Sequence, residues 1–137
     1  MSTEYFLDTN VLVYAFDQTQ PKKRERARDL LDPKRDWAIS WQVVQEFSSV
    51  ALHRFAEPVN PNFLENFLEL VRLPKCLVMP SQSLYTAAIS LHRKTQYRFY
   101  DSSIATAAVE SVASALWTGD LQAGRPSTRV QIENPSG

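Results

Sequence analysis

The sequence contains few of the residues that form covalent crosslinks or zinc sites. Among its 137 residues there is one cysteine, Cys76, and there are two histidines, His53 and His92, which lie far apart. An intrachain disulfide and a cysteine-based zinc site are therefore excluded, and the two histidines match no metal-ligand spacing. A lone cysteine also suits a reducing compartment.

The chain also lacks net charge and long apolar segments. Lysine plus arginine and aspartate plus glutamate number 15 each, so the formal net charge is zero. A nucleic-acid partner would therefore need a local basic patch. The apolar runs are too short to span a bilayer, and the N-terminus lacks the basic-then-apolar pattern of a signal peptide. We therefore expect a cytoplasmic protein that does not bind a membrane.

What the sequence does contain is the composition of one globular domain. It is 44% hydrophobic and 22% charged, which excludes a disordered chain, and it is long enough to bury a core. There is no internal repeat and no low-complexity segment. We therefore expect residues 1–137 to form a single domain.

A polar triplet interrupts the first apolar segment. Residues 5–7 are followed by Asp8-Thr9-Asn10, after which apolar residues resume at Val11. The run is typical of a strand buried on both faces, with a helix starting near Asn10 or Val11. The triplet then lies at the carboxyl end of the strand, where open α/β sheets bind ligands, and Asp8 is a candidate metal ligand. A turn that merely caps the helix is the alternative.

Strands and helices are predicted to alternate along the rest of the chain. Four more strands are predicted, at residues 37–40, 76–79, 113–117 and 128–133. The segments that separate the strands up to residues 113–117 carry apolar residues at helical spacing. This alternation predicts an α/β fold with a central, mostly parallel sheet of four to five strands.

Three more acids lie beside predicted strand ends or helix starts. Glu46 lies at the edge of the apolar stripe of a helix predicted over residues 41–55. Asp101 leads the buried stripe of a later helix, and Asp120 follows the strand at residues 113–117. Each has a plain structural alternative, namely a boundary glutamate, an N-cap aspartate and a Gly-Asp turn, respectively.

The four acids together indicate a metal site. The carboxyl ends of parallel strands share one edge of the sheet. We expect Asp8 and Asp120 at that edge, and Asp101 and Glu46 on helices that start from it. Like charges within about 4–6 Å oppose one another, so a divalent cation is expected to neutralise them. All-oxygen ligands select Mg²⁺ or Mn²⁺, which can activate water and hold a scissile phosphate.

The segments around these acids resemble a known family. Phe-Leu-Asp-Thr-Asn at residues 6–10, Gln-Glu-Phe at 45–47, Tyr-Asp at 100–101 and Trp-Thr-Gly-Asp-Leu at 117–121 are similar to the PIN domain. More narrowly, they resemble the VapC toxins of bacterial toxin–antitoxin pairs. The resemblance covers nearly the whole chain and matches the order and spacing of all four acids. The chain departs from the family near its end, where residues 122–127 and the tail from residue 134 are short.

The resemblance implies a three-layer α-β-α fold and a Mg²⁺- or Mn²⁺-dependent endoribonuclease. Its acidic site would comprise Asp8, Glu46, Asp101 and Asp120. Asp8 and Asp101 would be the primary metal ligands, and Asn10 and Thr118 match supporting polar positions. The implied partners are an RNA substrate, a small antitoxin that covers the cleft, and a second copy of the chain in a homodimer.

Two basic clusters can hold an RNA backbone. One lies on the helix predicted to start at Pro21, and the other comprises Arg93, Lys94 and Arg98. A solvated helix face is the alternative for the first cluster.

Three rival functions follow from the same residues. A phosphatase could use Asp8 as nucleophile, but such enzymes place a second aspartate two residues on, where this chain has Asn10. A PIN-like module could bind RNA or a partner without cutting RNA. The loss of one acid would favour such a module, but all four acids are present. A housekeeping nuclease outside any toxin–antitoxin pair is the third.

Overall fold

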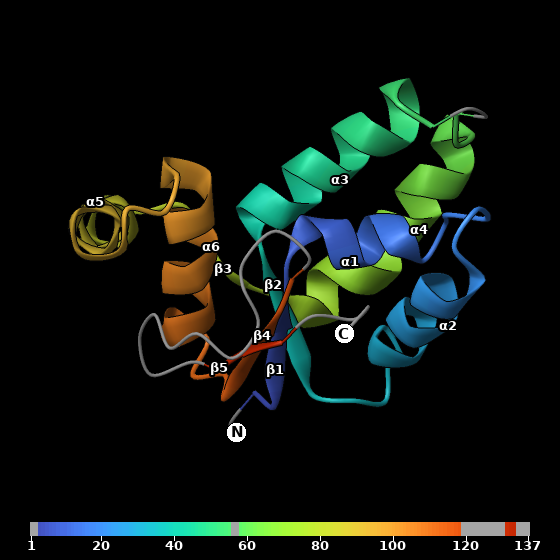
Figure 1. Ribbon diagram of the computed structural model, residues 1–137. Coiled ribbons are helices and arrows are strands. Elements are labelled where there is room, and N and C mark those ends of the chain that lie inside the picture. The colour runs from blue at the N-terminus through green and yellow to red at the C-terminus, as the bar shows by residue number, and fades with distance from the viewer. Residues whose placement is uncertain (1–2, 56–57, 119–130, 134–137) are drawn as a thin grey trace.

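The computed structural model describes residues 3–55, 58–118 and 131–133, and only the backbone of residues 71–74 and 131–133. Two helices follow each of the first three strands (Figure 1). The elements are β1 (Tyr5–Leu7), α1 (Thr9–Tyr14), α2 (Pro21–Leu30), β2 (Trp37–Ser40), α3 (Trp41–His53), α4 (Pro61–Lys75), β3 (Cys76–Val78), α5 (Gln82–Thr95), α6 (Phe99–Glu110), β4 (Ala115–Trp117) and β5 (Gln131–Glu133). None of the helices within these ranges is long and apolar enough to cross a membrane.

The five strands form one parallel sheet in the order β3-β2-β1-β4-β5. The central strand is β1, in which Phe6 pairs with Ala38 of β2 on one side and with Leu116 of β4 on the other. All three residues of β1 are buried, as a strand with helices on both faces requires. The predicted parallel sheet is confirmed.

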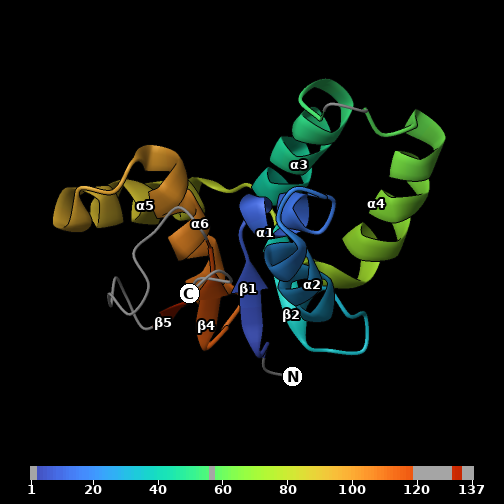
Figure 2. The same ribbon diagram turned by 45° about the vertical axis from the view of Figure 1, so that its right-hand side comes forward.

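Helices cover both faces of this sheet and make three layers. Helices α1 to α4 lie on one face, and α5 and α6 lie on the other (Figure 2). The strand order explains this division, because the chain moves from β1 outward to β3 and then crosses back to β4. Right-handed crossovers in opposite directions place their helices on opposite faces.

Helix α6 is the most deeply buried helix of the described chain. Its residues 102–108 are all buried, because it lies between the sheet and α5. A helix covered on opposite sides needs small or apolar side chains all round. The run from Ser102 to Ala108, which is rich in alanine and short hydroxyl residues, meets that need.

Several element boundaries differ from those predicted. Helix α1 begins at Thr9, earlier than predicted, because the Asp8 side chain caps it. Strand β4 begins only at Ala115, since the backbone N–H of Ala113 bonds to Ala108 and closes α6. Strand β3 ends at Val78 and α3 at His53, one and two residues short of the predicted ends. Of the predicted last strand, residues 128–130 lie outside the described residues.

Candidate functional site

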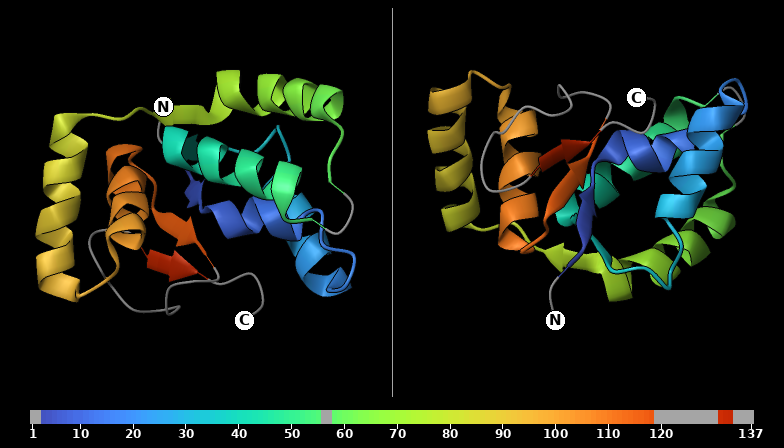
Figure 3. Two further views of the ribbon diagram at one scale, coloured as in Figure 1. Left: turned by 90° about the horizontal axis from the view of Figure 1, so that it is seen from above. Right: turned by 60° about the horizontal axis from the view of Figure 1, so that its bottom comes forward.

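The sheet has a topological switch point between β1 and β4. The chain leaves β1 toward β2 on one side, whereas β4 joins from the other side. Figure 3 (left) looks onto the edge where these strands end, with α6 on one side and α1 and α3 on the other. Open α/β sheets bind their ligands at such a point, outside the carboxyl ends of the strands. Asp8 follows β1 directly and Thr118 follows β4.

The Asp8 carboxylate bridges the two strand ends. Its side chain is buried, and Oδ1 accepts a hydrogen bond of 2.6 Å from the backbone N–H of Thr9. Oδ2 accepts a bond of 2.7 Å from the hydroxyl of Thr118, which is fully buried. The first bond is a helix cap, so the capping interpretation holds locally. The second bond is not needed for capping, and it fixes the carboxylate at the switch point.

Glu46 is connected to the same strand end through a threonine. Glu46 is exposed on the second turn of α3, and its Oε1 accepts bonds from Gln42 Nε2 at 2.9 Å and from Thr9 Oγ1 at 3.4 Å. The contacts through Thr9 and Gln42 were not predicted from the sequence. Gln42 could have been found, because residues four apart on a helix lie on one face.

Asp101 lies at the start of α6 and is not an N-cap. It is the third residue of that helix and half-buried, whereas Arg98 holds the cap position. The N-terminus of α6 lies toward the carboxyl ends of the strands (Figure 1). The N-cap alternative for Asp101 is therefore wrong. Asn10, the second residue of α1, is half-buried.

Oxygen ligands dominate this edge of the sheet. Within the described ranges no three His, Cys, Asp or Glu side chains gather as a metal-binding group, and the fourth predicted acid, Asp120, lies outside those ranges. The side chains that do meet are carboxylates, hydroxyls and the amide of Gln42. Such donors fit a hard ion such as Mg²⁺ or Mn²⁺, whereas zinc sites favour nitrogen and sulfur ligands.

The fold has three layers, with a parallel sheet between helices, and a buried carboxylate lies at the switch point of that sheet. These features define a class of α/β proteins with an acidic site at the carboxyl edge of the sheet. The family model of the PIN domain matches residues 5–126. The chain belongs to the PIN domain family, a nuclease family whose members generally use divalent metal ions. The predicted family and fold are thereby confirmed.

Solved structures with the same fold come from toxin–antitoxin complexes. A toxin–antitoxin complex from Klebsiella pneumoniae has a chain that is 19% identical, with a TM-score of 0.68, covering 96% of this chain and 98% of that one. VapBC2 from Rickettsia felis, bound to a promoter DNA fragment, matches at 19% identity and TM-score 0.65, with the same coverage. FitAcB from Neisseria gonorrhoeae matches at 22% identity and TM-score 0.65, again with that coverage. A comparison with the curated proteins found no match.

Proposed function

We propose that the chain is a Mg²⁺- or Mn²⁺-dependent endoribonuclease and the toxin of a type II toxin–antitoxin pair. The observation that carries the proposal is the buried Asp8 carboxylate, bonded to Thr118 across the β1–β4 switch point. The link from Thr9 to Glu46 extends the acidic edge to α3. The shared fold with chains of toxin–antitoxin complexes supports the toxin assignment.

The acids have different roles in this proposal. Asp8 and Asp101 are the primary metal ligands, and Asp120 and Glu46 complete the shell directly or through water. Thr118 holds the orientation of Asp8, and Asn10 orients water, metal or substrate. When bound, the ion supplies an acidified water and neutralises charge on the scissile phosphate. Cleavage leaves a 5′-phosphate and a 3′-hydroxyl.

Positive charge lies close to this edge of the sheet. The guanidinium of Arg26, on α2, lies 5.0 Å from the ring centroid of Trp117, the residue before Thr118. Lys23 on the same helix lies 4.6 Å from the ring of Tyr14. Stacking on aromatic rings holds both side chains against the body of the protein while their charges stay near the surface. We infer that α2 contacts the RNA backbone, and that the second cluster, at Arg93, Lys94 and Arg98, extends that contact.

The activity is tested with Asp101→Asn, which removes one metal-binding charge and keeps the side-chain shape. We expect wild type to cut RNA in Mg²⁺ or Mn²⁺ and to stop in EDTA, and the variant to lose cleavage while its circular dichroism stays unchanged. Glu110→Gln is the matched control, because Glu110 is an exposed acid at the other end of α6. Equal cleavage by Asp101→Asn, or cleavage undiminished in EDTA, contradicts the metal-nuclease proposal. RNA binding without any cleavage would favour the binding-module alternative.

The toxin assignment is tested separately in cells. We expect expression of the chain alone to slow bacterial growth, and co-expression of the small protein encoded beside it to restore growth. Analytical ultracentrifugation of the purified chain should show a homodimer. Normal growth at good expression, together with RNA cleavage in vitro, would identify a housekeeping nuclease instead.

A further inference from the structure

Thr9 donates hydrogen bonds to two of the acids of the proposed site. Its backbone N–H bonds to Asp8 Oδ1 at 2.6 Å, and its hydroxyl bonds to Glu46 Oε1 at 3.4 Å. Thr9 is the first residue of α1, whereas Glu46 lies on α3, which packs against α1. One residue therefore connects the acid at the end of β1 with an acid 37 residues further along the chain.

The hydroxyl of Thr9 is used differently from several hydroxyls within the helices. Those of Ser48, Thr95 and Thr106 each bond to the backbone carbonyl four residues earlier, as serine and threonine often do inside helices. No helical turn precedes Thr9, because α1 begins there. Thr9 is buried, and a buried hydroxyl needs a partner. Among the residues that the structure describes, its hydroxyl bonds to Glu46 alone.

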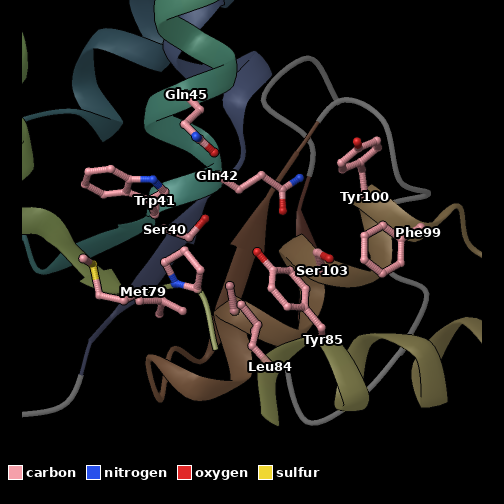
Figure 4. A pocket seen from close by; sticks show the side chains of 13 residues that line it. Ser40, Trp41, Gln42, Gln45, Met79, Leu84, Tyr85, Phe99, Tyr100 and Ser103 are labelled. Atoms are coloured by element: carbon pink, nitrogen blue, oxygen red, sulfur yellow. The ribbon is translucent and has the colours of Figure 1, made fainter. Parts of the chain in front are cut away.

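A second donor restrains the same oxygen of Glu46. Gln42 Nε2 bonds to Oε1 at 2.9 Å. Gln42 and Tyr100 line one cavity between α3 and α6, and Tyr100 directly precedes Asp101. Figure 4 shows the side chain of Gln42 extending from α3 toward Tyr100. The amide that holds Glu46 therefore lies in the cleft between the helices that carry Glu46 and Asp101.

These contacts leave the charge of Glu46 available to a cation. The Thr9 bond is longer than the usual O–H···O distance of about 2.7–2.8 Å, but it acts on Oε1 together with the shorter bond from Gln42. Both donors are neutral, and in the described part of the chain no lysine or arginine pairs with Glu46 and no donor reaches Oε2. An exposed glutamate loses rotamer entropy when it is fixed, so contacts that already restrain it reduce the entropy lost on binding an ion.

We propose that Thr9 is a positioning residue of the metal site, which holds Oε1 of Glu46 in a fixed place relative to Asp8 and leaves Oε2 to the ion. The inference rests on the proposed nuclease function. The alternative is that the hydroxyl only stabilises the start of α1. The two interpretations differ in their dependence on Glu46. A positioning residue affects metal binding only while Glu46 is present, whereas a residue that only stabilises α1 acts whether or not Glu46 is there.

The first test replaces Thr9 in the full chain. Thr9→Val removes the hydroxyl but keeps the shape of the side chain and the backbone N–H that bonds to Asp8. We expect Mn²⁺ affinity, measured by calorimetry, to fall about tenfold, as when a group that orients a metal ligand is lost. Thr9→Ser keeps the hydroxyl and should bind Mn²⁺ like wild type. Thr106→Val is the matched control, because Thr106 is similarly buried but donates to the carbonyl of Ser102, and it should also bind like wild type.

A double-mutant cycle then identifies the acid through which Thr9 acts. Glu46→Ala removes the acceptor of the Thr9 hydroxyl and should itself weaken Mn²⁺ binding. In that background we expect Thr9→Val to cause no further loss of Mn²⁺ affinity. A loss of the same size with and without Glu46 would overturn the inference, because Thr9 would then act through folding or through Asp8.

The outcomes distinguish this inference from the function on which it rests. If wild type binds Mn²⁺ and cuts RNA, and Thr9→Val does both equally well, the positioning role is wrong and the nuclease stands. If Thr9→Ser loses as much Mn²⁺ affinity as Thr9→Val, the hydroxyl is not the cause and the positioning role is again wrong. If the folded wild type neither binds Mn²⁺ nor cuts RNA, both proposals fail.

Discussion

Thr118 is the residue that ties the two central strand ends together. Its hydroxyl is fully buried and donates to Asp8 Oδ2 at 2.7 Å. Hydrogen bonds from buried groups to a metal-binding carboxylate orient that carboxylate, and their removal typically lowers metal affinity by about 10- to 100-fold. The function of Thr118 is therefore expected to be positional.

Thr118→Val tests this role, since valine has nearly the shape of threonine but cannot donate a hydrogen bond. We expect Mn²⁺ affinity, measured by calorimetry, to fall by at least about tenfold. Without metal, the free energy of unfolding should drop by about 1–3 kcal/mol, because the buried carboxylate loses the hydrogen bond that Thr118 donates. Thr118→Ser should retain both properties. Unchanged Mn²⁺ affinity in the valine variant would show that the bond does not position Asp8 for metal.

Tyr5 is a buried titratable residue in the central strand. It is 2% exposed, and its hydroxyl donates to the carbonyl of Leu30 at 2.6 Å, which ties β1 to the end of α2. Burial raises the pKa of Tyr5 to about 12, although the nearby Arg35 lowers it slightly. The charged form of this tyrosine is therefore disfavoured in the folded protein.

The raised pKa predicts a loss of stability in alkali. The unfolded tyrosine ionises near pH 10, so its contribution is fully present below pH 10 and is lost as the pH rises through about 12. The loss should be on the order of 2 kcal/mol. Tyr5→Phe should be about 1 kcal/mol less stable than wild type at pH 8, because the bond to Leu30 is gone. In urea unfolding this gap should close and then reverse as the pH rises from 10 to 12, because only wild type loses the contribution of the tyrosine. A gap that stays constant over that range would contradict the prediction.

At the scale of elements, the carboxyl end of α6 contains a valine in a position that usually requires glycine. Val112 has a φ of 59°, its N–H bonds to the carbonyl of Val109, and the N–H of Ala113 bonds to that of Ala108. This is the Schellman arrangement, in which the left-handed residue is usually glycine. A left-handed conformation costs other residues roughly 1–2 kcal/mol.

Val112→Gly should therefore stabilise the protein. The valine side chain is 71% exposed, so little buried surface is lost, and the relief of strain exceeds the entropy that glycine adds to the unfolded chain. We expect a net gain of about 1 kcal/mol in chemical denaturation. Val112→Ala is the control, because it keeps the Cβ atom that causes the strain and should gain much less. An equal gain from alanine and glycine would mean that the strain is not the cause.

At the scale of the whole molecule, we expect the proposed site to oppose folding until it binds metal. Acids that share one pocket repel one another, and an ion that binds only the native state offsets that repulsion by mass action. Asp8 also caps α1, so its replacement would mix two effects. Asp101 is not the N-cap residue of α6, so its replacement leaves that position unchanged, and it is the position that we choose to change.

Thermal melts of Asp101→Asn should reveal this opposition. In EDTA we expect the variant to be more stable than wild type by on the order of 1 kcal/mol, a rise of a few degrees in melting temperature at this size. In millimolar Mn²⁺ wild type should gain more than the variant, because its site binds the ion more tightly. Glu110→Gln should follow wild type in both conditions. If Asp101→Asn melts well below wild type in EDTA and responds fully to Mn²⁺, the acids do not share one site.

The sequence by itself determined the class of fold and the kinds of element. The apolar run of β1 and the helical spacing in α3 and α5 are local patterns, and the structure contains both. Local patterns predicted the first and last residues of the helices and strands less well than they predicted the kind of element. The Asp8 cap sets the start of α1, and the closing turn of α6 delays β4 to Ala115. The assignment of Asp120 to the acidic site stays a prediction.

Only the tertiary structure decided which of these residues meet. Asp8 and Thr118 are bonded although they are 110 residues apart, and Thr9 meets Glu46 across 37 residues. The stacking of the Tyr85 ring on the Phe99 ring likewise needs α5 and α6 packed together. Periodicity shows which face of an element is buried, but it carries no information about strand order. The order β3-β2-β1-β4-β5 places the end of β4 beside that of β1, and the site exists there because those two strands are neighbours.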